Sequence, residues 1–538
     1  MKKILVAIFC TFSILSYSQS KKFQFKTGSE YGLPRKAEDL SFFGNDEDGI
    51  VNLSLKREAL YFTRFDPKTL TQTDERIINL PEATGNMNSE MVVDFNKNYY
   101  WLMSDWDKDA QLESLYAVKV DVKNGKLSEK NQKLIETTKM ASNGLAGRGF
   151  YRFKQVEKYQ FNYDADHKKL LVSYRLTPED KRDKYNYDKL GMYVFDENMQ
   201  KLWGGEFTMP YTEKRMDNED FAVDAKGDAY LLAKVYETES RKEKDKDGNA
   251  GYHLEVFKFT KNNKQVINAT VSIDQYFIQE SSLIENAMHD MIIACTYSKK
   301  AWKNGTEGIF LGILNTEGKV ADYKKGFYKF PAAELEKFES RRQRRRIEKN
   351  EEYEIPNLKV RDVVVEKDGS VFIACEEYYY VEHYSNSGFG ATGIIYTTSG
   401  YTTYYYGDML GTKIDASGNF LWMRKMPKRQ SGTKGRGTMS FKLISDETGY
   451  YFLYLDNKKN EHLEEDETPA KHTDGFGGQV MVSKIDNKGD VTKEVIFDTR
   501  EEDVMIFPSE FTKINDHQFI GRARIKRTLF KPVLITMQ

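Results

Sequence analysis

The sequence contains little cysteine, no excess of positive over negative charge or the reverse, and no long apolar segment beyond its first residues. Three of the 538 residues are cysteines, Cys10, Cys295 and Cys375, which excludes a disulfide-rich scaffold. Lysine and arginine total 81 against 82 aspartates and glutamates, a net charge of −1, so nothing favours nucleic acid as a partner. After residue 18 no stretch approaches about 18 apolar residues, and no transmembrane helix is expected.

The first residues have the pattern of a signal peptide. Two lysines precede an apolar run at 4–15 that is too short to span a bilayer, and Ser16 and Ser18 supply the small residues that a signal peptidase needs. We therefore expect 1–18 to be removed, together with Cys10, and the mature chain to cover 19–538. A leader of this kind predicts a periplasmic or outer-membrane-associated protein, with secretion as the alternative.

The two cysteines that remain end similar apolar runs, "MIIAC" at Cys295 and "VFIAC" at Cys375. The similarity predicts equivalent interior strand positions in two neighbouring repeats. Two buried free thiols are the favoured interpretation, and a disulfide is the alternative, because the predicted compartment permits one. No histidine lies at ligand spacing from either cysteine, so no metal site is expected.

A turn flanked by alternating apolar residues recurs along the chain. Asp and Asn bond their own backbone and Gly accepts positive φ, so each copy predicts a hairpin with one buried face. The seven copies are "YFTRFDPKTL" (61–70), "YAVKVDVKNGKL" (116–127), "MYVFDENMQKLW" (192–203), "EVFKFTKNNKQV" (255–266), "FLGILNTEGKV" (310–320), "LGTKIDASGNFLW" (410–422) and "MVSKIDNKGDV" (481–491).

A second signature precedes these hairpins: an apolar strand, a polar turn and a more apolar strand, as in "VVVEKDGSVFIAC" (363–375). Eight copies are present. Proline often follows an apolar residue where the fourth strand of a unit would end, as in Met209-Pro210 and Phe330-Pro331. Because proline cannot donate to a sheet ladder, it is suited to a strand end or an outermost strand.

Each unit is therefore predicted to be a four-stranded antiparallel meander, and such sheets packed radially form an all-β β-propeller. Eight blades are expected, with seven as the alternative if one degenerate copy is a loop. The last unit supplies only three strands, ending in "KPVLITMQ", while "KKFQFKTG" near the start has no partner of its own. We expect this N-terminal strand to complete the last blade and to close a single domain spanning 19–538.

Two stretches resemble a known group of proteins. "KIDASGNFLWMRKMPKRQ" (413–430) and "MSFKLISDETGYYFLYLDNKKN" (439–460) are similar to repeats of uncharacterised secreted or envelope β-propeller-like proteins of Bacteroidota, and the leader ending before Gln19 is similar to theirs. The resemblance implies an envelope location and this architecture. It implies no catalytic residues.

The most unusual segment is a tyrosine-rich ribbon at 378–408, part of a predicted hairpin at about 376–408. It contains no lysine, and tyrosine offers flat, rigid contact area with a polar tip. We expect either a self-supporting hairpin that covers one end of the ring or a contact surface for a protein or glycan. Its tyrosines are Tyr378, Tyr379, Tyr380, Tyr384, Tyr396, Tyr401, Tyr404, Tyr405 and Tyr406.

A second unusual segment, 331–356, breaks the strand pattern. Strong helix formers between two prolines predict a helix joining two blades, a helical insertion at about 332–352. The interpretations are a solvated connector, with glutamates pairing to the arginines, or a docking helix for an acidic partner or lipid headgroups. The arginines are Arg341, Arg342, Arg344, Arg345 and Arg346.

No motif predicts catalysis or a cofactor. Asp105, Asp107 and Asp109 are spaced like the first ligands of a calcium loop, but Ala110 and Tyr116 stand where glycine and glutamate are needed, so a solvated turn is expected. The seven histidines are scattered, and no nucleophile elbow or phosphate loop is present.

The sequence thus favours a non-enzymatic binding or scaffolding propeller of the bacterial envelope, with a protein or glycan as partner. The alternative is a carbohydrate-active propeller enzyme whose acidic residues converge at the central mouth, because loops distant in sequence meet there.

Overall fold

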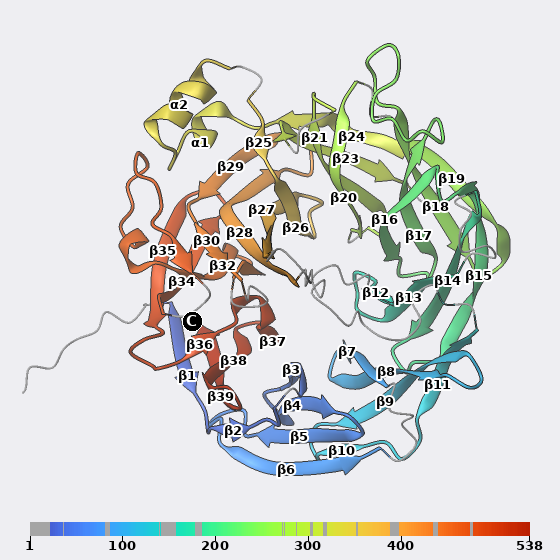
Figure 1. Ribbon diagram of the computed structural model, residues 1–538, viewed down its shortest axis with the longest axis vertical. Helices are drawn as coiled ribbons and strands as arrows, with labels where there is room; N and C mark the ends of the chain where they lie inside the picture. Colours follow the sequence, from blue (N-terminus) through green and yellow to red (C-terminus); the bar gives the residue numbers. More distant parts are fainter. Residues whose placement is uncertain are drawn as a thin grey trace, which may run out of the picture.

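The computed structural model describes residues 22–538 except 36, 81–86, 139, 141–157, 178–184, 272, 274, 287, 302–304, 316–319, 351–352, 388–396, 434–438 and 474–476. The predicted signal peptide, with Cys10, lies outside the described residues, as does Tyr396. Eight of the sheets in the described chain are antiparallel blades arranged radially around one axis, an eight-bladed β-propeller (Figure 1). The prediction of an all-β propeller with eight blades is confirmed.

Within each blade the first strand lies nearest the axis and the fourth lies outermost (Figure 1). The strands of blades 1 to 4 are, in turn, β3 (Glu38–Asn45), β4 (Gly49–Lys56), β5 (Ala59–Phe65) and β6 (Gln72–Asn79); β7 (Asn88–Phe95), β8 (Asn98–Asp107), β9 (Leu112–Asp121) and the split outer strand β10 (Lys126–Leu127) and β11 (Gln132–Thr137); β12 (Gln160–Tyr163), β13 (Lys169–Arg175), β14 (Tyr187–Asp196) and β15 (Lys201–Thr212); β16 (Met216–Val223), β17 (Ala229–Tyr236), β18 (Tyr252–Thr260) and β19 (Asn263–Val271).

Blades 5 to 8 follow the same order. Their strands are β20 (Phe277–Glu285), β21 (Met291–Ser298), β23 (Gly308–Leu314) and β24 (Val320–Lys329); β26 (Leu358–Val365), β27 (Val371–Ser387), β28 (Thr397–Ile414) and β29 (Phe420–Met426); β31 (Phe441–Asp446), β32 (Gly449–Asp456), β34 (Gln479–Asp486) and β35 (Val491–Asp498); β37 (Thr512–Asn515), β38 (Gln518–Lys526), β39 (Leu529–Met537) and β1 (Phe23–Thr27).

Short elements connect or extend the blades. They are β2 (Tyr31–Gly32), β22 (Gly305–Thr306), β25 (Ile355–Pro356), β30 (Gln430–Gly432), β33 (His472–Thr473), β36 (Met505–Ile506), the helices α1 (Ala332–Leu335) and α2 (Arg341–Glu348), and the 3₁₀ turns η1 (Lys458–Asn460) and η2 (Pro508–Glu510).

The repeated Asp and Asn turns make the hairpins that the sequence predicts. At the β28–β29 turn, for example, the Asp415 side chain accepts a hydrogen bond from the backbone N–H of Asn419, and Gly418 takes a φ of 74°. The same chemistry recurs at Asp66 and Asp486. Because the side chain satisfies the turn backbone, each hairpin is specified locally and in register.

The ring closes through its first described strand. β1 pairs antiparallel with β39, with Phe23 opposite Met537 and Thr27 opposite Val533, and Gln538 donates its N–H to the Lys22 carbonyl at 2.7 Å. Phe23 is 4% exposed and packs edge-on against Tyr451 of blade 7, with 5.7 Å between ring centroids. The predicted completion of the last blade by the N-terminal strand is confirmed.

The core lies between the blades. A separate apolar cluster fills each of the eight interfaces, from blades 1 and 2 round to blades 8 and 1. The second strands are the most buried, and every residue of β21 and β32 is buried. Cys295 and Cys375 lie on the second strands of blades 5 and 6, buried and free, which confirms the free-thiol interpretation over the disulfide.

None of the helices among the described residues is long and apolar enough to cross a membrane.

Candidate functional site: the tyrosine hairpin and its foot

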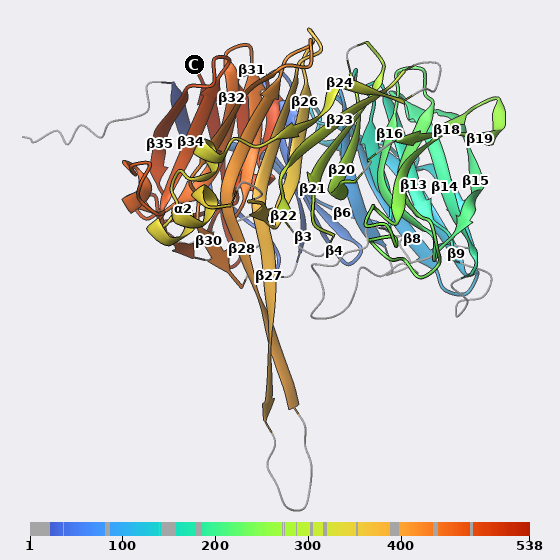
Figure 2. The same ribbon diagram turned by 90° about the horizontal axis from the view of Figure 1, so that it is seen from above.

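β27 and β28 continue far beyond blade 6 as a two-stranded ribbon that stands out from one face of the ring (Figure 2). We call this ribbon, from Tyr378 and Tyr406 outward, the tyrosine hairpin. Its strands stay in antiparallel register from Tyr378 opposite Tyr406 to Ser387 opposite Thr397. The ribbon is therefore a direct extension of the second and third strands of one blade.

Aromatic rings pair across the two strands. The rings of Tyr379 and Tyr405 stack at 4.6 Å with 9° between their planes. His383 and Tyr401 stack at 4.5 Å and 20°, with Val381 and Thr403 between the two stacks. Each cross-strand pair contributes about 0.2–1 kcal/mol, so the tyrosines stiffen a ribbon that would otherwise be marginal in water.

The same segment carries much of the exposed apolar surface of the described chain. Tyr379 and Tyr380 are each 44% exposed, Val381 is 39% exposed and Tyr401 is 56% exposed. Tyr404, by contrast, is buried at the base of the ribbon. Contiguous exposed aromatic surface of this kind marks interaction sites more often than ordinary surface.

Main-chain edges are also open along the ribbon. β26 and the Asn357 carbonyl cover the outer edge of β27 as far as Tyr378, and β29 and β30 cover the outer edge of β28 at 404–414. Beyond these points no strand of the described chain pairs with either arm. Lysine and proline, which commonly protect an edge, do not occur in 378–408.

A buried charged network anchors the side of the ribbon that carries Tyr378 and Tyr406. The Glu376 carboxylate accepts hydrogen bonds from Lys428 Nζ at 2.7 Å, Arg361 Nε at 2.8 Å and Ser440 Oγ at 2.7 Å. The side chains of Glu376 and Lys428 are both fully inaccessible. Such a carboxylate is stable only because its charge and both oxygens are satisfied.

Arg361 joins this network to the first tyrosine pair. Its guanidinium carbon lies 5.0 Å from the ring centroid of Tyr378 and 5.9 Å from that of Tyr406. Burial raises the pKa of Tyr406 well above its usual value, so its hydroxyl stays neutral. The foot of the hairpin is thus fixed by a cation between the aromatic pair and a buried carboxylate.

A second network lies on the other side of the foot. Lys425 Nζ donates to Glu339 Oε1 at 2.7 Å and lies 3.1 Å from Asp408 Oδ2. Burial alone would lower the pKa of Lys425, but Asp408 and Glu339 hold it above its ordinary value. Burial and the charge of Asp408 raise the pKa of Glu377 to about 8.

The helical insertion between blades 5 and 6 consists of two short helices instead of one. α1 ends before Phe338, which takes a φ of 62°, and Ser340 then caps α2 by accepting from the N–H of Gln343. Leu335 and Ile347 bury this insertion against blades 5 and 6. The prediction of a single helix is wrong, because a left-handed residue interrupts the helical run.

The structure places the two predicted contact elements close together. Glu339, in the turn between α1 and α2, meets Lys425 at the foot of the tyrosine hairpin. Arg344 donates to the Asp466 carbonyl at 3.3 Å, while the other four arginines of α2 are exposed. The expected pairing of these arginines with glutamates along the helix does not occur among the described residues. Tyr384 belongs to β27, but its side chain is not described.

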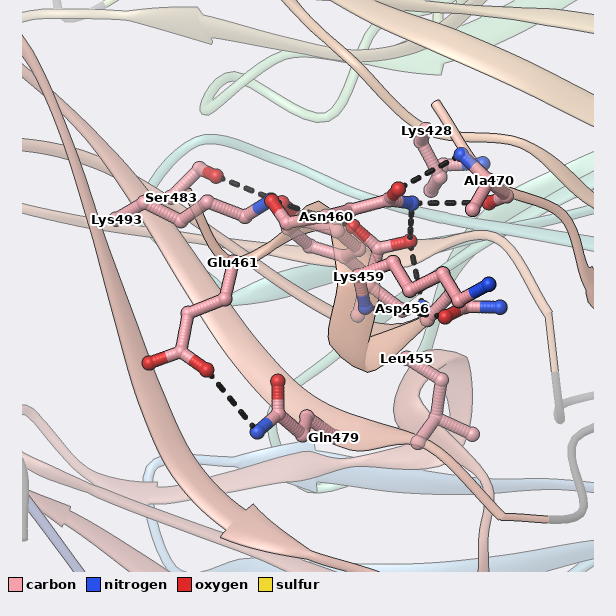
Figure 3. Close-up of polar contacts among 12 residues, drawn as sticks. Lys428, Leu455, Asp456, Lys459, Asn460, Glu461, Ala470, Gln479, Ser483 and Lys493 are labelled. Carbon is pink, nitrogen blue, oxygen red and sulfur yellow. Dashed lines mark hydrogen bonds and ion pairs between the residues drawn. The ribbon is translucent and has the colours of Figure 1, made fainter. Parts of the chain in front are cut away.

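The insertion also meets blade 7 at a pocket of about 240 Å³, lined by Lys337 and Phe338 on one side and Asn460 and Lys493 on the other. Figure 3 shows the polar contacts beside it: Asn460 Nδ2 donates to Asp456 Oδ1 at 2.7 Å, and Lys493 Nζ donates to the Asn460 carbonyl at 2.7 Å. Burial raises the pKa of Asp456. These contacts fix the β32–β34 loop, and the sequence reasoning missed them because no local pattern signals them.

Carboxyl groups on the innermost strands bear on the enzyme hypothesis. Asp220 accepts from the N–H of Leu283 at 2.8 Å, Glu219 accepts from Ser281 Oγ at 3.2 Å, and Glu280 forms an ion pair with Lys359. Burial raises the pKa of Asp220 to about 6. Each contact joins neighbouring blades, so these three groups serve the ring itself.

The calcium-like turn closes on itself. Asp107 Oδ1 accepts from the N–H groups of Asp109 and Ala110, as in an ordinary aspartate turn. Within the described residues no three His, Cys, Asp or Glu side chains are arranged to hold a metal ion.

Comparisons with known proteins give distant likenesses only. No family model matches the chain, and no curated relative does. The chain is similar to a protein of unknown function from Dyadobacter fermentans, with 8% identity over 96% of this chain and 99% of that one at a TM-score of 0.32. It is also similar to the β-propeller domain of the Trilobed protease from Pyrococcus furiosus, with 10% identity over 87% and 97% at 0.32. It is similar as well to an ulvan lyase, with 11% identity over 82% of this chain and 90% of that one at a TM-score of 0.37. At these values the comparisons carry no argument about function, and the eight blades follow from the strand pairing itself.

Proposed function

We propose that this protein is a non-enzymatic binding propeller of the bacterial envelope, periplasmic or associated with the outer membrane, that holds a partner protein through its tyrosine hairpin. The observation that carries this proposal is a ribbon with exposed aromatic side chains and open main-chain edges, standing clear of the ring (Figure 2). The ring supplies a rigid base, and the networks around Glu376 and Lys425 hold the ribbon to it.

The stacking of the aromatic side chains on the tyrosine hairpin favours a polypeptide partner over a glycan. Sugar rings bind to open aromatic faces, but Tyr379 with Tyr405, and His383 with Tyr401, already cover one face of each other. The ribbon also has two open main-chain edges, and the edge of β28 before Tyr404 is rich in β-branched threonine. An extended segment of a partner pairs with such an edge through main-chain hydrogen bonds, and side chains next to the edge give specificity.

The test uses a variant in which residues 381–403 are replaced by Asn-Gly. Tyr380 faces Tyr404 across the ribbon, so a two-residue turn closes the shortened hairpin in register. Affinity capture from envelope extracts is compared between this variant and the intact protein. We expect partners that the intact protein retains to be lost from the variant. Equal recovery of every captured protein would refute the proposal.

Two point variants separate the kinds of partner. Thr402→Lys places a charge on the open edge and should abolish strand addition while leaving the stacked rings in place. Tyr379→Ser with Tyr401→Ser removes both stacks. Loss of binding only in the second variant, together with retention of a polysaccharide, would identify a glycan partner.

One observation favours a second function, that of a carbohydrate-active enzyme. Asp362 lies on the innermost strand of blade 6, and although its side chain is exposed, desolvation by the surrounding protein raises the pKa of its carboxyl against the opposing charge of Lys442. A carboxyl with a raised pKa can act as the general acid in glycoside hydrolysis, a reaction that also needs a second carboxylate nearby. Release of reducing ends from envelope polysaccharides by the intact protein, and its loss in Asp362→Asn, would support the carbohydrate-active alternative.

A further inference from the structure

The exposed side of α2 carries a dense stripe of positive charge. Successive helical residues are about 100° apart, so Arg341, Arg345, Lys349, Arg342 and Arg346 fall in that order within an arc of about 140°. All five are exposed. Among the described residues none of them forms an ion pair or a side-chain hydrogen bond. We call this set the arginine stripe.

The opposite side of α2 is committed to the fold. Ile347 is buried against blades 5 and 6, Gln343 Nε2 donates to the Tyr353 hydroxyl at 2.7 Å, and Arg344 holds the Asp466 carbonyl. The helix is therefore fixed with the arginine stripe facing outward. Its direction does not depend on any partner.

Some charges of the arginine stripe oppose the stability of the helix that carries them, although Arg345 and Arg346 in the last turn complement its dipole. Arg341 with Arg345, and Arg342 with Arg346, are like charges four residues apart, which weaken a helix. Arg341 and Arg342 also occupy the first turn, where the helix dipole favours acidic residues. Local rules broken together at exposed positions point to a function outside the fold.

The neighbouring surface restricts the shape of an anionic partner. The acidic β32–β34 loop exposes Glu464, Asp466 and Glu467 and is tied to the insertion by an ion pair of 2.7 Å between Lys337 and Glu465. A flat anionic bilayer that covered the stripe would also press against these carboxylates. A narrow chain covers less of this surface, and on α2 itself it meets one exposed carboxylate, Glu348, at the edge of the stripe.

The spacing of the cations fits an extended acidic peptide. Arg341, Arg345 and Lys349 form one row with a rise of about 6 Å per step. In an extended strand alternate side chains lie on one side, about 6.6 Å apart. Carboxylates on every second residue of a peptide therefore meet successive cations of the row.

From these contacts and spacings we infer that the arginine stripe binds an extended polypeptide segment with an acidic residue at every second position. This site is separate from the tyrosine hairpin and does not depend on the function proposed for it. Guanidinium groups form paired hydrogen bonds with carboxylates, which gives the stripe its preference for such a segment.

The experiment measures fluorescence anisotropy of two labelled 12-residue peptides with the mature chain, 19–538. One peptide alternates Glu and Thr, and the other has the same composition with its glutamates in blocks of three. We expect the alternating peptide to bind about threefold or more tightly than the other, and binding to disappear as NaCl rises from about 0.02 to 0.3 M.

Variants assign the binding to the stripe. Arg→Gln at positions 341, 342, 345 and 346 should weaken binding about tenfold or more, since four exposed ion pairs are lost. Arg→Lys at the same positions keeps the charge but loses the paired hydrogen bonds, so its affinity should lie between those of the intact protein and the Arg→Gln variant. A matched control removes four exposed charges from blade 2, at Lys108, Lys123, Lys126 and Lys130, and should leave binding unchanged.

Several results would overturn the inference. They are no binding of the alternating peptide to the intact protein, equal loss in the stripe and blade 2 variants, equal affinity for both peptides, or binding of a polyuronate or of vesicles with about 30% anionic lipid in place of the peptide. The far-ultraviolet circular dichroism of each variant checks that the ring is intact.

Discussion

The buried pair of Glu376 and Lys428 gives the sharpest test of how the tyrosine hairpin is anchored. Glu376→Gln removes the charge that both Lys428 and Arg361 face, and Lys428 is fully inaccessible. Leaving a buried cation without its partner costs about 3–5 kcal/mol. We expect the free energy of unfolding to fall by that amount.

The reverse change should cost less. Lys428→Met leaves the Glu376 carboxylate with Arg361 at 2.8 Å and Ser440 at 2.7 Å, so about 1–3 kcal/mol is expected. The inequality between the two variants follows from the number of partners that each removal leaves. In the double variant the two costs should not add, because the residues form one network.

Urea unfolding followed by tryptophan fluorescence measures these differences. The control is Glu58→Gln on an exposed turn, whose free energy of unfolding should lie within about 0.5 kcal/mol of that of the intact protein. A cost below about 1 kcal/mol for Glu376→Gln would show that the network does not hold its charges away from water. Equal costs for the two single variants would refute the reasoning about remaining partners.

Three further changes test other parts of the structure. Phe23→Ala removes a buried side chain from the closing strand β1, and we expect the free energy of unfolding in urea to fall by about 3–5 kcal/mol. Proteolysis near residue 30 should increase as well. An unchanged free energy of unfolding would mean that β1 does not close the ring. Folding raises the pKa of Glu377 to about 8, so the stability that its protonated carboxyl contributes is complete below the unfolded pKa of about 4.5 and is lost as pH rises through 8. Glu377→Gln should therefore flatten the dependence of unfolding free energy on pH between these values. An unchanged slope in the variant would contradict this prediction. Neutralising the four exposed arginines of α2 removes two like-charged pairs, and thermal melting should show equal or slightly higher stability, about 0.5–1 kcal/mol; a clear drop would reveal structural pairing of these side chains.

The repeated pattern made the propeller predictable. Aspartates such as Asp415 and Asp486 sit in turns between alternating strands, and because strand and turn signals are local, the hairpins and their number follow from the sequence. The closing strand followed from counting, since the last unit lacked one strand. The interruption at Phe338 did not follow, because nothing in its type signals a positive φ.

The candidate site was predicted only in part. The tyrosine hairpin and the arginines were visible as unusual composition in continuous segments. The network at its foot was not, because Glu376 is 52 residues from Lys428 and 64 from Ser440, and it meets them only when blade 6 has folded and the segment entering blade 7 packs against it. A charged residue directly after the apolar run "VFIAC" was the one available signal. Burial of charge depends on tertiary neighbours, which a local pattern does not contain.

The pairing of β1 with β39 ties the order of assembly to the order of synthesis. Blades 1 to 7 are built from strands that follow one another, so each forms from short-range contacts, whereas blade 8 waits for the last strand to meet the first. Until these strands pair, the open ring exposes the faces of blades 1 and 7 that blade 8 later covers, and both faces are rich in aromatic and aliphatic side chains. A chaperone that shields such flanks would act on this protein chiefly in the interval before its final strand arrives.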